Sequence, residues 1–313
     1  MTQTSVKAVK SILSRSQLPG SDWAANPYLG CSHACLYCYA RFMQRFSEHS
    51  GPWGSFIEVK DWPELDPLKE RPRLAGKSIL IGSVTDPYLP EEAEFKRTRT
   101  LLQQLLALSQ PTGLLSNAGL LQNEGLLPDE DLLSDEGFSL TLITKSDLIT
   151  RDLDLLKQFP QVRVVFSINT VDEALKAQLD AAPSIARRLS ALKACHDAGL
   201  TTACFIAPIM PGLTDVAAVI HAVRPYCHEI WLDSLNLHPS CKEPVLRYIA
   251  TQQPHLKPLY HAIYEAHDLS FWRELDRYLR QIATACNLPY CTDFAEVKPC
   301  EVKPALVNFS APS

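Results

Sequence analysis

Short apolar runs alternate along the chain with segments whose apolar residues recur at helical spacing. One clear unit is SILIGSV at 78–84, followed by the turn-like TDPYLP and by a helical pattern over 91–108 that begins with acidic residues. Carboxylates favour the first turn of a helix because they meet the positive end of its dipole. The same order of strand, loop and helix recurs, with further strands expected at 138–145, 162–169, 201–212 and 228–236 and helices at 151–159, 183–198 and 215–226.

The apolar runs predict strands that are buried on both faces, as in a parallel sheet covered by helices. With a first strand near 23–28, the pattern gives about six strand–helix units, fewer than the eight of a closed barrel. We therefore predict an α/β fold, a partial (β/α)6 TIM-like barrel whose ligands gather at the carboxyl ends of the strands. The expected divisions are an N-terminal extension at 1–25, the partial barrel at 26–237, and a C-terminal helical cap and tail at 238–313.

One segment of the predicted barrel departs from this pattern. GLLSNA, GLLQNE, GLLPDE and DLLSDE follow one another within 113–136 with a period of six residues. A solenoid uses longer units and more of the chain, so we expect a hexapeptide-repeat insertion between a helix and the next strand.

Composition narrows the functional classes. The 313 residues are 46% hydrophobic and 21% charged, which is typical of globular proteins, and the apolar runs are too short to cross a bilayer. The polar N-terminus lacks the apolar centre of a secretory signal, so we expect a cytoplasmic protein. The net charge of −5 offers no general attraction for nucleic acid.

Three cysteines stand close together in GCSHACLYCYARF at 30–42, namely Cys31, Cys35 and Cys38. In a reducing compartment such clustering favours metal binding over disulfides. Structural zinc takes four protein ligands, and only His33 within the loop could complete such a set. A [4Fe–4S] cluster held by three thiolates instead leaves one iron free to bind a substrate or cofactor.

The spacing Cys-x3-Cys-x2-Cys, with an aromatic residue before the last cysteine, resembles that of the radical S-adenosylmethionine superfamily. NPYLGCSHACLYCYAR, GSVTDPYLPEE, LITKS and FSINT further resemble blocks of its spore photoproduct lyase-like branch. The resemblance implies a [4Fe–4S] cluster at the three cysteines, with S-adenosylmethionine bound to the open iron. It also implies reductive cleavage to a 5′-deoxyadenosyl radical that abstracts hydrogen from an unidentified substrate, in a reaction of lyase or transferase type. The electron would come from a donor such as flavodoxin or ferredoxin.

The same resemblance assigns individual residues. The positions that match contacts to S-adenosylmethionine follow three of the predicted strands: Thr85, Asp86, Lys145, Ser167 and Asn169. Tyr37 and Tyr39 match catalytic tyrosines that flank the last cluster cysteine. The lyase itself returns a hydrogen atom from a cysteine whose position here is Ser83, and an O–H bond is too strong for that role. We therefore expect a member of the branch other than the lyase.

Other hypotheses stay open beside this one. A nucleic-acid lesion repair or base-modifying enzyme is an alternative that the acidic net charge does not favour. A non-catalytic zinc-binding protein is another. Four further cysteines are candidates for a second iron–sulfur cluster, although their spacing follows no regular pattern: Cys241, Cys286, Cys291 and Cys300.

Overall fold

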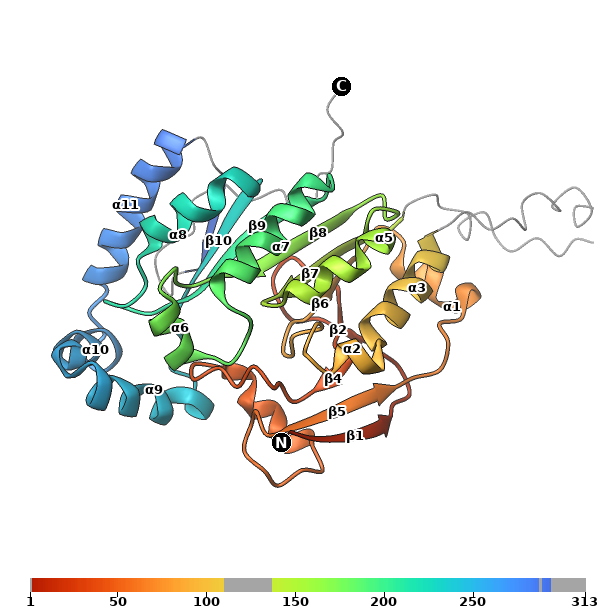
Figure 1. Ribbon diagram of the computed structural model, residues 1–313, viewed down its shortest axis with the longest axis horizontal. Helices are drawn as coiled ribbons and strands as arrows, with labels where there is room; N and C mark the ends of the chain where they lie inside the picture. The colour runs from red at the N-terminus through yellow and green to blue at the C-terminus, as the bar shows by residue number, and fades with distance from the viewer. Residues whose placement is uncertain (1, 110–136, 287–288, 294–313) are drawn as a thin grey trace, which may run out of the picture.

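An eight-stranded sheet forms the centre of the computed structural model, which describes residues 2–109, 137–286 and 289–293 (Figure 1). The strand order is β11-β10-β9-β8-β7-β6-β3-β2. All neighbours pair in parallel except β2 (Leu13–Arg15), which runs antiparallel to β3. The parallel strands are β3 (Trp23–Ala25), β6 (Ser78–Ile81), β7 (Ser139–Thr144), β8 (Val162–Ser167), β9 (Thr201–Ile209), β10 (Glu229–Ser234) and β11 (Tyr290–Asp293).

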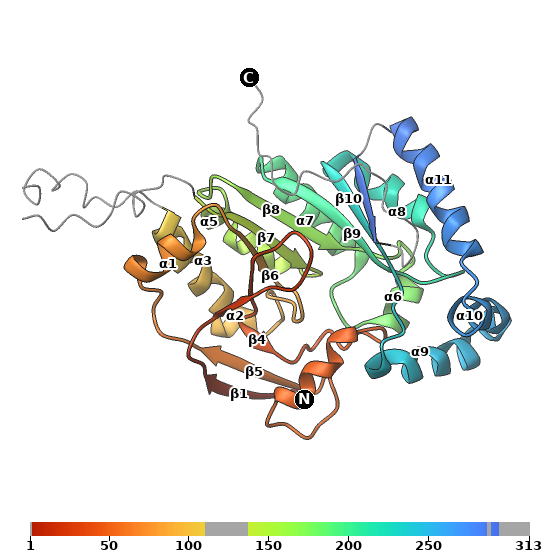
Figure 2. The same ribbon diagram turned by 180° about the vertical axis from the view of Figure 1, so that it is seen from behind.

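Helices between successive strands cover one face of this sheet, and Figure 2 shows the opposite face from behind. They are α3 (Arg97–Ser109), α5 (Leu153–Leu156), α7 (Ile185–Asp197) and α8 (Val216–Val223), with the 3-10 turns η4 (Asp147–Asp152) and η5 (Arg224–Tyr226). The short helix α6 (Glu173–Leu179) instead packs into the hydrophobic cluster that contains Cys35. The main hydrophobic core lies between these helices and the strands. The predicted α/β fold and partial barrel are confirmed, because the six predicted strands lie side by side in chain order.

A second, three-stranded sheet lies beside the first, in the order β1-β5-β4. It contains β1 (Gln3–Ala8), β5 (Phe56–Asp61) and β4 (Tyr28–Leu29), and α1 (Pro67–Leu74) follows it. The strand expected near 23–28 is thus divided between two sheets. The expected N-terminal extension also supplies strands to both sheets, since β3 pairs with β6 and β1 with β5.

Two more elements differ from the sequence prediction. The helix expected over 91–108 is broken into α2 (Glu92–Phe95) and α3 at Lys96, whose φ of 52° is left-handed. The C-terminal region contains α9 (Pro239–Gln252), η6 (Pro254–Leu256), α10 (Lys257–Tyr264) and α11 (Ser270–Cys286), and it also returns β11 to the sheet. The repeat at 113–136 lies outside the described residues.

The C-terminal helices pack against the loop that carries the three cysteines. Val245, Ile249 and Tyr260 share a hydrophobic cluster with Cys35 and Tyr37. This packing closes the side of the partial barrel next to the loop. Among the described residues, no helix is both long enough and apolar enough to span a bilayer.

Candidate active site

The three clustered cysteines lie in one loop between β4 and the 3-10 helix η1 (Tyr39–Phe46), and all three line the same cavity. Cys31 and Cys35 are each 8% exposed, and none of the three forms a disulfide. The loop leaves β4 at Gly30, whose φ is +88° and where a Cβ atom would meet the Phe56 carbonyl oxygen at 2.2 Å. Only glycine allows this close approach, which fixes where the loop begins.

Burial disfavours the thiolate form of the loop cysteines. Burial raises the pKa of the Cys31 thiol, and the neighbouring Cys35 and Cys38 raise it further. Burial likewise raises the pKa of Cys35 to about 12, against the opposing effect of Lys145. Three thiolates this close together need a metal to supply the compensating charge, because metal coordination deprotonates thiols.

The number of thiols in the loop bears on the kind of metal site it could form. Within the described part of the chain, no three Cys, His, Asp or Glu side chains are placed to share a single metal ion. Three protein ligands with an open cavity beside them match a cluster with one free iron rather than a closed zinc site.

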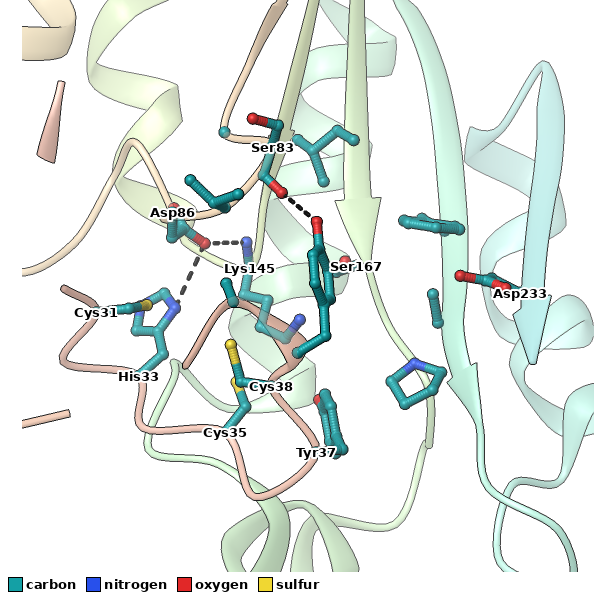
Figure 3. Close-up of a pocket in the computed structure, with 18 of the residues that line it drawn as sticks. Cys31, His33, Cys35, Tyr37, Cys38, Ser83, Asp86, Lys145, Ser167 and Asp233 are labelled. Atoms are coloured by element: carbon teal, nitrogen blue, oxygen red, sulfur yellow. Dashed lines mark hydrogen bonds and ion pairs between the residues drawn. The ribbon is translucent and has the colours of Figure 1, made fainter. Parts of the chain in front are cut away.

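The carboxyl ends of β6, β7 and β8 form the wall opposite the loop (Figure 3). Thr85, Lys145 and Ser167 line the cavity there, as the sequence predicted for strand-end residues. The empty volume is about 950 Å³, which includes the part open to solvent. Thr85 is 2% exposed, and its Oγ1 has no hydrogen-bond partner among the described residues. A buried hydroxyl without a partner costs free energy, so this atom fits a ligand that fills the cavity.

Asp86 has a different part in the site. Its carboxylate accepts hydrogen bonds from the Lys145 backbone N–H at 2.6 Å, from the Thr144 hydroxyl at 2.7 Å and from the Tyr88 backbone N–H at 2.9 Å. The Nδ1 atom of His33 lies 3.4 Å from the same carboxylate. Asp86 therefore joins the cysteine loop to the ends of β6 and β7, which makes it a positioning residue.

His33 is the polar side chain of the loop that could have been a fourth ligand. It is 2% exposed, and burial lowers the pKa of its imidazole. Its Nδ1 faces Asp86, while Nε2 has no partner within the described residues. His33 therefore braces the cysteine loop against Asp86.

A buried network fixes the back of the cysteine loop. Asp180, after α6, accepts a hydrogen bond from the Tyr37 hydroxyl at 3.2 Å and forms an ion pair with Arg188 at 2.7 Å. The Arg188 side chain is fully buried and also donates to the Ser167 carbonyl at 3.3 Å. Burial raises the pKa of the Asp180 carboxyl, but Arg188, Lys145 and Lys176 outweigh it and hold that pKa below its ordinary value.

The two candidate tyrosines differ in environment. Tyr37 is 6% exposed and directs its hydroxyl to Asp180, whereas Tyr39 is 42% exposed and donates to the Ser83 carbonyl at 2.7 Å. The Ser83 hydroxyl accepts from the Asn26 amide at 2.9 Å. Tyr39 and Ser83 thus meet at the cavity.

Some predicted residues do not line the cavity. Asn169 is 2% exposed and donates at 3.4 Å to the carbonyl of Pro208, which does line it. Cys241 is buried, and its thiol faces the carbonyl oxygens of Asn236 and His238. Cys291 lies in β11, the side chain of Cys286 is not described, and Cys300 lies outside the described residues. A second cluster stays a prediction.

Sequence reasoning missed a wall of the cavity and the burial of Arg188. Phe205, Asp233 and Asn236, from β9, β10 and the segment after β10, line the side opposite Thr85. These residues carry no local motif, so only the folded sheet brings them to the cavity. Arg188 did have a signal, because it shares the apolar face of α7 with Ile185 and Cys195, which are buried three residues before and seven after it.

A partial parallel barrel that carries three free thiols at its strand ends is the architecture of an α/β protein that binds a metal cluster there. The chain belongs to the radical SAM superfamily, whose sequence profile matches residues 25–222. An uncharacterized protein of Methanocaldococcus jannaschii is 34% identical over 236 residues, which are 75% of this chain and 78% of that protein. An uncharacterized protein of Mycobacterium tuberculosis strain H37Rv is 26% identical over 202 residues, 62% of this chain and 51% of that one.

Solved structures of the superfamily share the fold. Spore photoproduct lyase complexed with dinucleoside spore photoproduct has a TM-score of 0.52 at 16% identity, over 78% of this chain and 66% of the lyase. Streptococcus suis SuiB bound to S-adenosylmethionine has a TM-score of 0.51 at 13% identity, over 94% of this chain and 51% of SuiB. The predicted superfamily and its lyase-like fold are confirmed.

Proposed function

We propose that the protein cleaves S-adenosylmethionine reductively at a [4Fe–4S] cluster held by Cys31, Cys35 and Cys38. The observation that carries this proposal is the meeting of three free thiols, two of them buried, with the unpartnered Thr85 hydroxyl in one cavity. When bound, the cluster and S-adenosylmethionine together supply a 5′-deoxyadenosyl radical that takes a hydrogen atom from the substrate.

The residues of the chain bind and orient the cofactor. Lys145 is half-buried in the cavity wall, with its ammonium 5.8 Å from the Tyr37 ring centroid. An ammonium and two hydroxyls, those of Thr85 and Ser167, can hold the carboxylate of the methionine part by charge-assisted hydrogen bonds. Asp86 binds both the Lys145 backbone N–H and His33 of the cysteine loop, so it fixes the position of Lys145 relative to that loop. Asn169 would affect the ribose of S-adenosylmethionine only indirectly, through its hydrogen bond to the backbone carbonyl of Pro208.

The reaction on the substrate is proposed to differ from that of the lyase. The hydrogen-donating position holds Ser83, and its hydroxyl is engaged with Asn26. Tyr39 lies at the cavity mouth, next to Ser83, where it can meet a substrate. The substrate wall is formed by Phe205, an apolar surface, and by the carboxyl of Asp233. A small molecule or peptide group fits this wall better than a polyanionic strand.

Anaerobic reconstitution tests the cofactor assignment. The wild-type protein should bind about four irons per chain, and Cys35→Ala should lose them. Cys195→Ala is the matched control, since Cys195 is also a buried free cysteine but lies on α7 outside the cavity. Equal iron in the two variants would reject the ligand set.

Binding of S-adenosylmethionine to the reconstituted protein tests the strand-end residues. Lys145→Met removes a charge-assisted contact worth about 1.5–3 kcal/mol, so affinity should fall at least roughly tenfold. Lys157→Met, at the exposed residue that follows α5 and does not line the cavity, should leave affinity unchanged. Unaltered binding by Lys145→Met would remove Lys145 from the site.

A further inference from the structure

The segment just before β5 packs directly on the cysteine loop. Gly54 has a φ of +101°, and a Cβ atom there would meet the Ala34 Cβ at 2.6 Å, so this close approach requires glycine. Trp53, the residue before it, is 5% exposed and shares a hydrophobic cluster with Cys31, and Cys38 packs against the same cluster. Trp53 is not among the residues that line the cavity, so it reaches the cysteine loop from outside the cavity.

The Trp53 ring is well packed, but its polar atom is not satisfied. The ring stands edge-on to Phe56, with the two ring centroids 6.0 Å apart and the ring planes at 90°. The indole Nε1 is shielded from solvent and has no hydrogen-bond partner within the described residues. A buried N–H without an acceptor destabilises a fold, and a phenylalanine could pack here without that cost. Apolar packing alone therefore does not explain an indole at this position.

The acceptor that this N–H faces is the sulfur of Cys38. Burial raises the pKa of the Cys38 thiol, whereas hydrogen bonds to its thiolate form, from the Ala40 backbone N–H and from the Trp53 side chain, lower that pKa. A neutral thiol is a weak hydrogen-bond acceptor, and a charged thiolate is a strong one. The Trp53 indole thus gains its partner when Cys38 is held as a thiolate, which is the form that ligates a metal.

We propose that the Trp53 indole N–H donates to the Cys38 sulfur in the cluster-bound protein and thereby raises the reduction potential of the cluster. This inference rests on the proposed function. Hydrogen bonds to the sulfurs are among the factors that set the potential of an iron–sulfur cluster. Reduction adds one electron, supplied by the reductant, and increases the negative charge on the sulfurs. A donor at Cys38 therefore stabilises the reduced form more than the oxidised form, and the indole keeps its proton throughout.

Trp23 is a matched control within the same chain. It is 3% exposed in β3, and its indole Nε1 also lacks a hydrogen-bond partner among the described residues. It belongs to the main hydrophobic core, where the guanidiniums of Arg15 and Arg73 lie 4.1 Å and 4.3 Å from its ring centroid. Replacing either tryptophan by phenylalanine removes one N–H and part of a buried ring. An effect of lost packing should therefore appear in both variants, and an effect of a hydrogen bond to sulfur only in Trp53→Phe.

The test is a redox titration of the reconstituted full-length protein, without S-adenosylmethionine, followed by electron paramagnetic resonance. Trp53→Phe should lower the equilibrium constant for reduction roughly tenfold, which moves the potential of a one-electron couple by about 59 mV to the negative side. Trp23→Phe should leave the potential unchanged, and both variants should keep about four irons per chain. A wild-type potential in Trp53→Phe at wild-type iron content would overturn the proposal, as would an equal shift in Trp23→Phe.

A second measurement decides the question if Trp53→Phe assembles no cluster. Wild-type protein grown with a heavy-nitrogen label in its indole rings should show a coupling between that nitrogen and the reduced cluster in pulsed electron paramagnetic resonance. Labelled Trp23→Phe should keep this coupling, because its Trp53 is intact. A reduced wild-type cluster without the coupling would overturn the proposal. A wild-type protein that assembles no reducible cluster would instead overturn the proposed function itself.

Discussion

Replacing Arg188 by methionine tests whether the buried network behind the cysteine loop stabilises the fold. The substitution keeps much of the side-chain volume but removes the guanidinium, which donates to the Pro183 carbonyl at 2.9 Å, to the Ser167 carbonyl at 3.3 Å and to Asp180 at 2.7 Å. Asp180 is then left buried, with its side chain 1% exposed. Removing one partner of a buried pair costs about 3–5 kcal/mol because the other charge is left uncompensated.

The structure places this estimate at the lower end of the range. Lys176 lies 3.6 Å from the Asp180 carboxylate and stays in place in the variant, as does the hydrogen bond from Tyr37. We therefore expect Arg188→Met to lower the free energy of unfolding by about 3 kcal/mol. The adjacent Arg187 is the control, because its side chain is 63% exposed and its ion pair with Asp147 should contribute at most about 1 kcal/mol.

Urea unfolding followed by circular dichroism measures both variants under identical conditions. A double variant, Asp180→Asn with Arg188→Met, should recover part of the loss, since no buried charge then remains unpaired. The difference in free energy of unfolding between the wild type and Arg188→Met should narrow as pH falls through 3.8 and below. The reason is that the lowered pKa of Asp180 stabilises the folded state only where the carboxyl is ionised. If Arg188→Met and Arg187→Met lowered the free energy of unfolding by amounts within about 1 kcal/mol of each other, the stabilising role of the buried network would be refuted.

Three further changes test other parts of the structure. Burial lowers the pKa of Lys60 from 10.5 to about 8, so between these pH values the unfolded protein binds more protons than the folded protein. The free energy of unfolding should therefore rise with pH in this window by up to about 3 kcal/mol. Urea unfolding of Lys60→Met that showed the same rise with pH would contradict this. Gly30→Ala places a Cβ atom 2.2 Å from a carbonyl oxygen, so the variant should melt at a temperature several degrees lower and bind less iron. Unchanged iron content would show that the loop can shift to accommodate the methyl group. Asp86→Asn keeps the side-chain shape but weakens three hydrogen bonds at the strand ends, so affinity for S-adenosylmethionine should fall by roughly tenfold. Calorimetry that gave the wild-type affinity would exclude a positioning role for Asp86.

The central sheet was predictable because its signal is local and repeated. Val162 to Ser167 are all buried in β8, as a mostly apolar run indicates despite Arg163, and each such run is followed by a turn and a helical segment. Strands of two or three residues gave no such signal. Tyr28 and Leu29 form β4 in the second sheet, and they adjoin Trp23–Ala25 closely enough to be mistaken for one strand.

The site was predictable where a motif or a strand end marks it. The cysteines are recognisable by spacing, and Thr85, Lys145 and Ser167 follow strands whose carboxyl ends meet at one edge of the sheet. Partners that come from distant segments have no such mark. Asp180 meets Tyr37 across 143 positions of sequence, and this contact depends on how α6 and α7 pack behind the loop.

Cleavage of S-adenosylmethionine is the measurement that bears most directly on the central claim. The reconstituted protein, reduced with dithionite under anaerobic conditions, should convert S-adenosylmethionine to equal amounts of 5′-deoxyadenosine and methionine, and Cys35→Ala should form neither. Intact S-adenosylmethionine, in a sample that carries about four irons per chain and shows a reduced cluster by electron paramagnetic resonance, would contradict the account.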